Sequence, residues 1–324
     1  MKGYSSEKVR NVILLGHGGC GKTTFLEAAL LKTKAINRLG KIEDGNTVSD
    51  YDKIEIEKKH SIKTTLVPVE YNGYKYNFLD TPGFFDFEGE VKSALGTVGA
   101  AVIMLDASAG VQVGTEKAWD LCSEYKTPTF ILLNKIDKEG VDCDAVVEEL
   151  REKFGNSVVT DDDMDALNEA VAGTSEELME KFFNDEPFTE EEFVNGLMNG
   201  IAVGEIVPVF KASNFTGEGI DHLLTAIPRY VPDPEEHAPY PALNSNDEEV
   251  EVDCNVKGDP VMYIFKTIAD PFLGKISYAK VMAGTVKAGQ ELYNARSQKS
   301  EKLGSMFFVR GNSRRLQQKF LREI

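Results

Sequence analysis

The sequence has 324 residues, of which 42% are hydrophobic, and a formal net charge of −17 with an isoelectric point near 4.8. This length and apolar fraction predict one large or two ordinary globular domains with a substantial core. The negative charge argues against a protein that wraps free DNA or other bare nucleic acid through bulk charge, although it is compatible with docking on a ribonucleoprotein through a local patch. No apolar run approaches the length of a membrane span.

A glycine-rich stretch follows an apolar run at residues 9–15 and precedes helical spacing over residues 22–32. Its pattern, Gly-x-x-x-x-Gly-Lys-Thr between strand and helix, is typical of a phosphate-binding loop rather than of a turn that binds nothing. Inward-pointing N–H groups and the helix N-terminus attract phosphate, Lys22 would reach the β- and γ-phosphates, and the Thr23 hydroxyl would bind Mg²⁺. The residues expected around the phosphates are Gly16, His17, Gly18, Gly19, Cys20, Gly21, Lys22, Thr23 and Thr24.

Residues 36–61 are polar and charged and show no clear period. A long irregular segment directly after a phosphate-loop helix is either a disordered excursion or a mobile functional loop. In a nucleotide switch protein, the part of the chain that senses the γ-phosphate would lie here.

Two alternating runs, residues 65–71 and 74–79, flank an Asn-Gly pair and predict a hairpin with a type I′ turn. The second run ends in Asp80-Thr81-Pro82-Gly83. A carboxylate at a strand end beside the phosphate loop can hold Mg²⁺ through its waters, and Gly83 leaves a backbone N–H free to approach the γ-phosphate. The alternative is an ordinary Pro-Gly turn, which we disfavour because the phosphate loop lies upstream at a suitable distance.

Two continuous apolar runs, residues 100–106 and 129–133, predict strands of a parallel sheet that is covered on both faces. The second run ends in Asn134-Lys135-Ile136-Asp137. The Asp137 carboxylate could accept from both N1–H and the N2 amine of guanine, a donor pattern that adenine lacks. Asn134 would brace the base edge and the phosphate loop, and the stem of Lys135 would lie along the ring.

The remainder of the chain divides into three expected parts. Residues 141–203 look helical and acidic, and a strand at 205–210 leads into Ser213 and Asn214, whose backbone N–H groups could contact guanine O6. A proline- and acid-rich linker is expected over residues 232–257. Short alternating strands with glycine-rich turns then predict an incomplete β-barrel over residues 258–324, with an open edge because the basic last stretch loses the alternation.

Together these motifs resemble the translational GTPases, and most closely the first part of elongation factor G or one of its paralogues. The resemblance covers residues 8–310 and includes Asp106-Ala107-Ser108-Ala109-Gly110-Val111 and Asp270-Pro271-Phe272-Leu273-Gly274-Lys275. It implies an α/β fold: a P-loop NTPase G domain over residues 1–231, with a mostly parallel sheet and a helical insert at 141–203, followed by part of the barrel called domain II. It also implies a GTP/GDP switch that uses Mg²⁺, hydrolyses GTP and acts on the ribosome.

Four departures from the family pattern bear on activity. Gly19 stands where the family usually carries Asp, and the insert is expected to lack a strand-rich part. Aligning the family's Arg-Gly-Ile-Thr-Ile with His60-Ser61-Ile62-Lys63-Thr64 puts Lys63 at the Mg²⁺-binding threonine, so that Thr64 or Thr65 would bind the metal only after a shift in register. Phe84 stands at the family's catalytic histidine, and phenylalanine has no group to orient the attacking water.

The expected function is therefore a GTPase that is slow in isolation. The alternatives are a GTP-dependent binding module with little turnover, a ribosomal protection or release-type factor, or a fragment of a longer factor, since the family's three further domains are not expected in this chain. The four cysteines show no pairing or metal spacing, which is typical of reduced thiols in a cytoplasmic protein.

Overall fold

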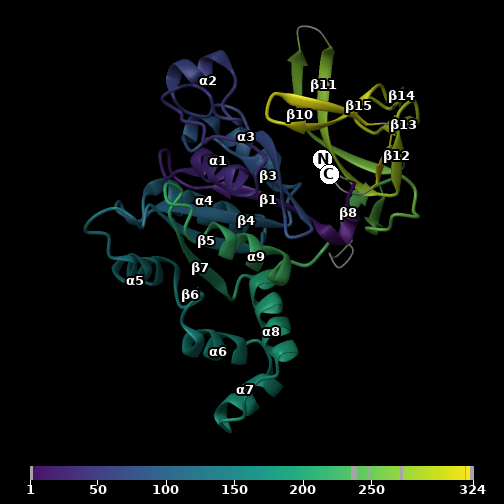
Figure 1. Ribbon diagram of the computed structural model, residues 1–324. Coiled ribbons are helices and arrows are strands. Elements are labelled where there is room, and N and C mark those ends of the chain that lie inside the picture. Colours follow the sequence, from purple (N-terminus) through teal and green to yellow (C-terminus); the bar gives the residue numbers. More distant parts are fainter. Residues whose placement is uncertain are drawn as a thin grey trace.

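The computed structural model describes residues 3–234, 239–244, 246, 248–270, 273–317 and 319–321. Its centre is a seven-stranded sheet in the order β2-β3-β1-β4-β5-β7-β6 (Figure 1). The strands are β1 (Val9–Leu15), β2 (Thr65–Tyr71), β3 (Tyr74–Asp80), β4 (Ala100–Asp106), β5 (Thr129–Asn134), β6 (Val158–Thr160) and β7 (Val207–Ala212). All neighbours are parallel except the hairpin β2-β3. The expected mostly parallel sheet is thus confirmed.

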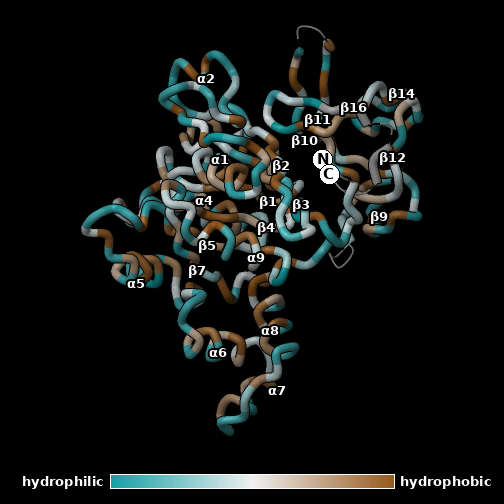
Figure 2. The backbone as a smooth tube through the Cα atoms, in the orientation of Figure 1, coloured by the Kyte–Doolittle hydropathy of each residue, from teal (hydrophilic) through white to brown (hydrophobic). Residues whose placement is uncertain are grey.

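Helices cover both faces of this sheet. Along β1, Val12 and Leu14 join one buried cluster with α1 (Lys22–Lys32) and α9 (Ile220–Tyr230), whereas Ile13 and Leu15 join the opposite cluster. The remaining α-helices are α2 (Lys53–Lys58), α3 (Glu88–Leu95), α4 (Val113–Glu124), α5 (Cys143–Phe154), α6 (Met164–Ala172), α7 (Glu176–Phe183) and α8 (Glu190–Val203). Helices α3, α4 and α5 contribute to the second cluster, and α6, α7 and α8 to the first. Burial on both faces explains why the central strands read as unbroken apolar runs, which Figure 2 shows as brown segments.

The region 141–203 holds α5 to α8, as expected, and one strand that the sequence pattern did not indicate. Residues Val158–Thr160 form β6, which pairs in parallel with the start of β7 and forms the edge of the sheet. Three residues are too few to show an alternating pattern, so only the neighbouring strand reveals this element.

The irregular segment after α1 is ordered against that helix. Glu27, which is 1% exposed, accepts hydrogen bonds from the backbone N–H of Gly40 (2.9 Å) and of Val48 (2.5 Å). The segment then forms α2, which begins with a capping box, and Lys59 ends it in the left-handed conformation with φ 57°. A buried carboxylate from the phosphate-loop helix therefore fixes the path of this segment, a long-range contact that its own sequence does not encode.

The C-terminal part consists of antiparallel pairs: β8-β9, β10-β11, β12-β17, β13-β14 and β15-β16. These strands are β8 (Tyr240–Leu243), β9 (Glu249–Val252), β10 (Val261–Asp270), β11 (Gly274–Ala283), β12 (Thr285–Lys287), β13 (Glu291–Asn294), β14 (Lys299–Lys302), β15 (Met306–Arg310), β16 (Ser313–Gln317) and β17 (Lys319–Leu321). The region is rich in strands, as expected.

Two details differ from the expectations for this part. The residues expected as a linker contain the hairpin β8-β9, although residues 235–238, at the centre of the proline- and acid-rich stretch, lie outside the described residues. The basic last stretch also forms strands, because β16 pairs with β15 and β17 pairs with β12. Cross-strand hydrogen bonds stabilise these strands even without a clear hydrophobic alternation.

The β-rich part packs directly on β2 and β3. The backbone N–H of Gly311 donates to the carbonyl of Leu66 (3.0 Å), and a Cβ at Gly311 would lie 2.0 Å from the carbonyl oxygen of Val48. The ammonium of the buried Lys75, on β3, lies 4.4 Å from the centre of the Phe308 ring on β15. Among the described residues, no helix combines the length and apolar character needed to cross a bilayer.

Candidate functional site

The phosphate loop joins β1 to α1 and depends on glycine where the backbone is crowded. Gly16 has φ 129°, and a Cβ there would lie 2.2 Å from the carbonyl oxygen of Met104. At Gly21, with φ 105°, a Cβ would lie 2.3 Å from the side-chain nitrogen of Asn134. These positions must be glycine because side chains both clash there and disfavour a positive φ. The Nζ of Lys22 lies across the loop and donates to the carbonyl of Gly16 at 2.8 Å.

Hydroxyl and carboxylate oxygens gather where the loop meets α1. The Thr23 hydroxyl donates to Asp80 (2.8 Å) and lies 3.2 Å from the hydroxyl of Ser61. Asp50 is also buried here, beside the hydroxyl of Ser61. Burial, and then the charge of Asp80, raise the pKa of Asp50 to about 7, and burial also raises the pKa of Asp80. Two buried carboxylates beside two hydroxyls form a donor set that suits a hard divalent cation such as Mg²⁺.

Thr64, which was expected as a metal ligand only after a shift in register, contacts Glu90 in this structure. Its hydroxyl donates to the carbonyl of Glu90 (3.1 Å), and its backbone N–H donates to the carboxylate of the same residue (2.7 Å). Thr64 therefore contacts α3 and not the Thr23 end of the phosphate loop.

Ser61, and not Lys63, contacts Thr23 of the phosphate-loop helix in this structure. The left-handed turn at Lys59 redirects the chain after α2, so that Ser61 contacts the phosphate-loop helix. The ammonium of Lys63 lies 2.6 Å from the carboxylate of Asp52 at the start of α2. Lys59 adopts its left-handed conformation although such positions more commonly hold glycine or asparagine.

The turn after β3 lies against the phosphate loop. A Cβ at Gly83 would lie 2.6 Å from the Nζ of Lys22 and 2.7 Å from the backbone nitrogen of Gly18, so only glycine permits this approach. The ring of Phe84 covers Gly18: a Cβ at that glycine would lie 3.1 Å from the ring. Phe84 is 44% exposed.

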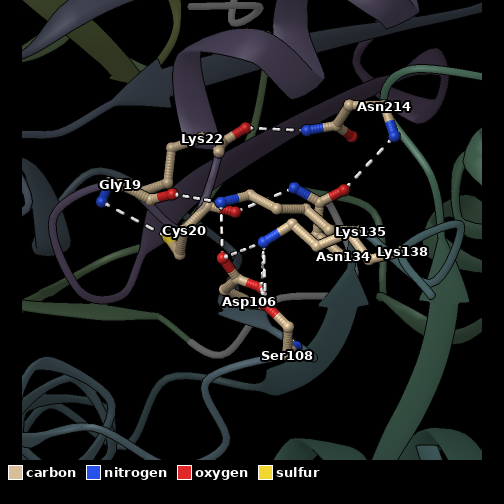
Figure 3. Close-up of polar contacts among 10 residues, drawn as sticks. Gly19, Cys20, Lys22, Asp106, Ser108, Asn134, Lys135, Lys138 and Asn214 are labelled. Carbon is tan, nitrogen blue, oxygen red and sulfur yellow. Dashed lines mark hydrogen bonds and ion pairs between the residues drawn. The ribbon is translucent and has the colours of Figure 1, made fainter. Parts of the chain in front are cut away.

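Asn134 ties the phosphate loop to the loop after β7. Its amide nitrogen donates to the carbonyl of Cys20 (2.8 Å), and its amide oxygen accepts from the backbone N–H of Asn214 (3.2 Å). The Asn214 amide in turn donates to the carbonyl of Gly21 (2.9 Å). Figure 3 shows this arrangement. Asn134 is 1% exposed, so its orientation is determined by these partners.

Asp137 is positioned by a hydroxyl. The Ser213 side chain donates to the Asp137 carboxylate (2.5 Å) and accepts from the backbone N–H of Thr216 (3.1 Å). A serine that already accepts from the backbone has its proton available for the carboxylate, which fixes one oxygen and leaves the other for a ligand. The sequence pointed to base contact through the Ser213 backbone and did not indicate this role of its side chain.

Asp106, at the end of β4, is a further charged residue of the site for which the sequence indicated no role. Its carboxylate lies 2.6 Å from the ammonium of Lys135 and 3.2 Å from that of Lys138 (Figure 3). Burial acts to raise the pKa of Asp106, but hydrogen bonds from Lys135, Ser108 and Lys138 hold it well below the usual range. The ammonium of Lys135 also donates to the carbonyl of Gly19 (2.8 Å), so the stem of Lys135 lies across the opening of the site. The sequence signals for this residue were its position at a strand end and its place in the Asp106–Val111 stretch of the family resemblance.

A cavity of about 550 Å³ connects these groups, within the range of small-molecule sites. It runs from Thr23 and Gly83 at one end to Asp137 at the other. The expected nucleotide-binding residues on its wall are Gly18, Gly19, Gly21, Lys22, Thr23, Thr24, Asn134, Lys135, Asp137 and Asn214. Gly16, His17, Cys20 and Ser213 are not on the wall, and His17 instead packs against Gly114 on α4.

Comparison with known proteins gives consistent matches. A family model described as elongation factor Tu GTP binding domain matches residues 7–233, and one described as elongation factor G domain 2 matches residues 259–320. An elongation factor G-like protein from Thermotoga maritima is 31% identical over 340 residues, covering 93% of this chain and 49% of that protein. A crystal structure of a protein from Thermus thermophilus has 27% identity and a TM-score of 0.83, covering 97% of this chain and 51% of that one. The chain spans about half the length of both.

Proposed function

The chain belongs to the family of the elongation factor Tu GTP-binding domain, and from this premise we propose that it binds GTP with Mg²⁺ and hydrolyses it to GDP and phosphate as a conformational switch on the ribosome. One observation carries the proposal. A single cavity joins the Lys22 and Thr23 end of a phosphate loop to the carboxylate of Asp137. That arrangement fits a nucleoside triphosphate with its base at Asp137.

Guanine specificity rests on Asp137. With one oxygen held by Ser213, the carboxylate can accept from N1–H and the N2 amine of guanine. Adenine would leave this carboxylate desolvated and without a donor, which costs several kcal/mol, on the order of 2–4. The backbone N–H groups of Ser213 and Asn214 donate to the carbonyl of Glu218 (3.0 Å) and to the amide oxygen of Asn134 (3.2 Å), so the expected contact with guanine O6 requires one of these bonds to be exchanged.

Mg²⁺ is proposed to be held by Thr23 and Ser61, with Asp80 and Asp50 bonded to its waters. The burial of Asp50 close to Asp80 supports this assignment because burial and the charge of Asp80 raise the pKa of Asp50, and a cation stabilises two such buried carboxylates. When bound, the ion would neutralise charge on the β- and γ-phosphates. Mg²⁺ commonly keeps several waters and uses phosphate oxygens, so a small set of protein ligands suffices.

The roles proposed for Lys22 and Gly83 follow from their positions. Lys22 would stabilise the charge on the β- and γ-phosphates, and the backbone N–H of Gly83 would donate to the γ-phosphate. Phe84 offers no hydrogen bond, so hydrolysis is expected to be slow in isolation. The ribosome as partner, and with it a cytoplasmic location, rests on the likeness to an elongation factor G-like protein.

Phe84 also favours a second candidate, a GTP-dependent binding module with little turnover. The two are separated by titrating GTP, GDP and ATP and then measuring hydrolysis with and without ribosomes. GTP binding with ribosome-stimulated turnover supports the switch, and GTP binding without turnover supports the module. Equal affinity for ATP and GTP would contradict both.

Under the switch hypothesis, Phe84→His raises single-turnover hydrolysis. An unchanged rate both with and without ribosomes contradicts that expectation.

A further inference from the structure

We propose that His60 supplies the side chain that orients the attacking water, the task for which Phe84 lacks a hydrogen-bonding group. This inference rests on the proposed GTPase function. It concerns a residue that the sequence aligned with the arginine of the family's switch pattern and for which it indicated no catalytic role.

His60 lies at the γ-phosphate end of the cavity. It lines the cavity together with Gly83 and Phe84, and its ring centre lies 4.7 Å from that of Phe84. The next residue, Ser61, contacts Thr23 at the proposed metal position. The imidazole therefore lies next to the turn after β3. This is beside the place proposed for the γ-phosphate.

The hydrogen bond of His60 determines which ring nitrogen is available. The Nδ1 atom lies 3.2 Å from the backbone carbonyl oxygen of Ser61. A carbonyl oxygen only accepts, so Nδ1 carries the proton, and in the neutral ring Nε2 keeps its lone pair. Within the part of the chain that the structure describes, Nε2 makes no hydrogen bond, so it is available as an acceptor for water.

Phe84 fixes the orientation of this imidazole. Its ring packs between His60 and Gly18 of the phosphate loop, with an angle of 60° between the planes of the two aromatic rings. Phe87 stands near the imidazole as well, with ring centres 6.1 Å apart. Two apolar rings therefore lie beside the imidazole, so that His60 has the polar role and Phe84 the packing role.

The proposed step is the attack of a water molecule on the γ-phosphorus of GTP. The water oxygen forms a bond to the γ-phosphorus while the bond from that phosphorus to the oxygen bridging the β- and γ-phosphates breaks. The electron pair of the broken bond stays on GDP, and the water proton leaves with the phosphate product. His60 Nε2 accepts a hydrogen bond from the water during the attack, which directs an oxygen lone pair at phosphorus and does not require His60 to retain a proton.

If His60 had only a structural role, packing on Phe84, the hydrolysis rates of two substitutions would rank in the opposite order. His60→Phe keeps an aromatic ring against Phe84 and removes the acceptor. His60→Gln keeps an acceptor and removes the ring. The full chain is used for both variants, with His222→Phe and His222→Gln as matched controls, because His222 is an exposed residue of α9 that does not line the cavity.

The measurements are GTP and GDP affinity, thermal unfolding, and single-turnover hydrolysis. His60→Phe is expected to lower the hydrolysis rate by about 100-fold, the lower end of what a positioned proton-handling side chain contributes, with nucleotide affinity retained. His60→Gln is expected to keep more of the rate than His60→Phe, and the His222 variants the full rate. If His60→Phe matches wild type, the inference is wrong while the GTPase function stands. If the wild-type chain does not hydrolyse GTP, the proposed function fails and this inference with it.

Discussion

The ammonium of Lys266, on strand β10, lies 2.8 Å from the carboxylate of Glu90 on helix α3. The same ammonium donates to the backbone carbonyl of Thr64 (2.7 Å), and Glu90 accepts from the backbone N–H of Thr64 (2.7 Å). One lysine of the β-rich part thus contacts both the segment after α2 and the helix after the Asp80 turn. Burial lowers the pKa of Lys266, so the pair lies in a weakly solvated contact.

Replacing Lys266 by alanine is expected to lower the free energy of unfolding by about 1.5–3 kcal/mol, because Glu90 and the Thr64 carbonyl each lose a charged donor. Chemical denaturation measures this difference. Lys299→Ala removes an exposed lysine of β14 and serves as the control. Equal stability of the two variants would show that the Lys266 contact contributes nothing.

Asp137→Asn is expected to remove most of the preference for GTP over ATP. The substitution replaces two charge-assisted hydrogen bonds to guanine by weaker amide contacts, which corresponds to roughly 100-fold in GTP affinity. Competition titrations with GTP and ATP measure it. Glu139→Gln changes a nearby exposed carboxylate outside the cavity wall and is expected to bind as wild type does. An Asp137→Asn protein that still prefers GTP as strongly as wild type would contradict the proposed orientation of the base.

Ser61 and Thr64 can be distinguished through Mg²⁺. Ser61→Ala is expected to raise the Mg²⁺ concentration needed for half-maximal GTP binding by about tenfold, the effect of losing one oxygen ligand worth about 1.4 kcal/mol. Thr64→Val removes the hydroxyl that donates to Glu90 and keeps the β-branched shape, and it is expected to leave this concentration unchanged. The reverse ranking would restore Thr64 as the ligand.

Asp161 and Asp162 are expected to affect stability with opposite pH dependences. Burial, and to a lesser extent the charge of Asp162, raise the pKa of Asp161 to about 6, even though the charge of His222 acts to lower it. In the pH range between the ordinary value and 6, the folded state binds a proton that the unfolded state releases. The stability contributed by Asp161 is therefore lost as the pH rises through that range. Asp161→Asn should remove the loss, a gain on the order of 1 kcal/mol at pH 7 after solvent screening.

The neighbouring residue provides the control. The hydrogen bond from Lys211 lowers the pKa of Asp162, so its stabilising contribution is present at neutral pH and disappears as the pH falls below the ordinary value for aspartate. Asp162→Asn is therefore expected to destabilise the chain at pH 7 and to have little effect in acid. Denaturation of both variants at several pH values tests the two signs, and the same sign for both would exclude the proposed difference in environment.

The parts of the site that could be predicted from sequence are those whose backbone conformation requires particular residues. The phosphate loop needs glycine at Gly16 and Gly21, and Gly83 must approach Lys22, so the pattern of residues reports the geometry. The central strands could be predicted because both faces are buried. In each case the conformation or burial depends on residue types that can be read directly from the stretch itself.

The parts that could not be predicted depend on contacts between distant residues. Ser61 contacts Thr23 after a left-handed residue, Lys59, ends α2, and no local pattern indicates such a turn at a lysine. The role of Asp106 depends on two lysines that follow the next strand. The strands β8 and β9 lie in a region whose composition is typical of linkers, and only their mutual pairing defines them.

The carboxylate of Glu27 has a consequence for how far the segment after α1 can move. Glu27 holds Gly40 and Val48 at the beginning of the segment, and Glu90 holds Thr64 at its end. Within it, Glu55 accepts from the backbone N–H of Ile62 and Lys63. Glutamates of two helices outside the segment therefore anchor both of its ends. A third glutamate, Glu55 of α2, accepts hydrogen bonds from the backbone just before Thr64. A rearrangement at Ser61 that leaves these anchors intact is confined to the residues between Val48 and Thr64. A larger rearrangement that displaces Thr64 would also change the contact with strand β10, because Lys266 donates to the Thr64 carbonyl.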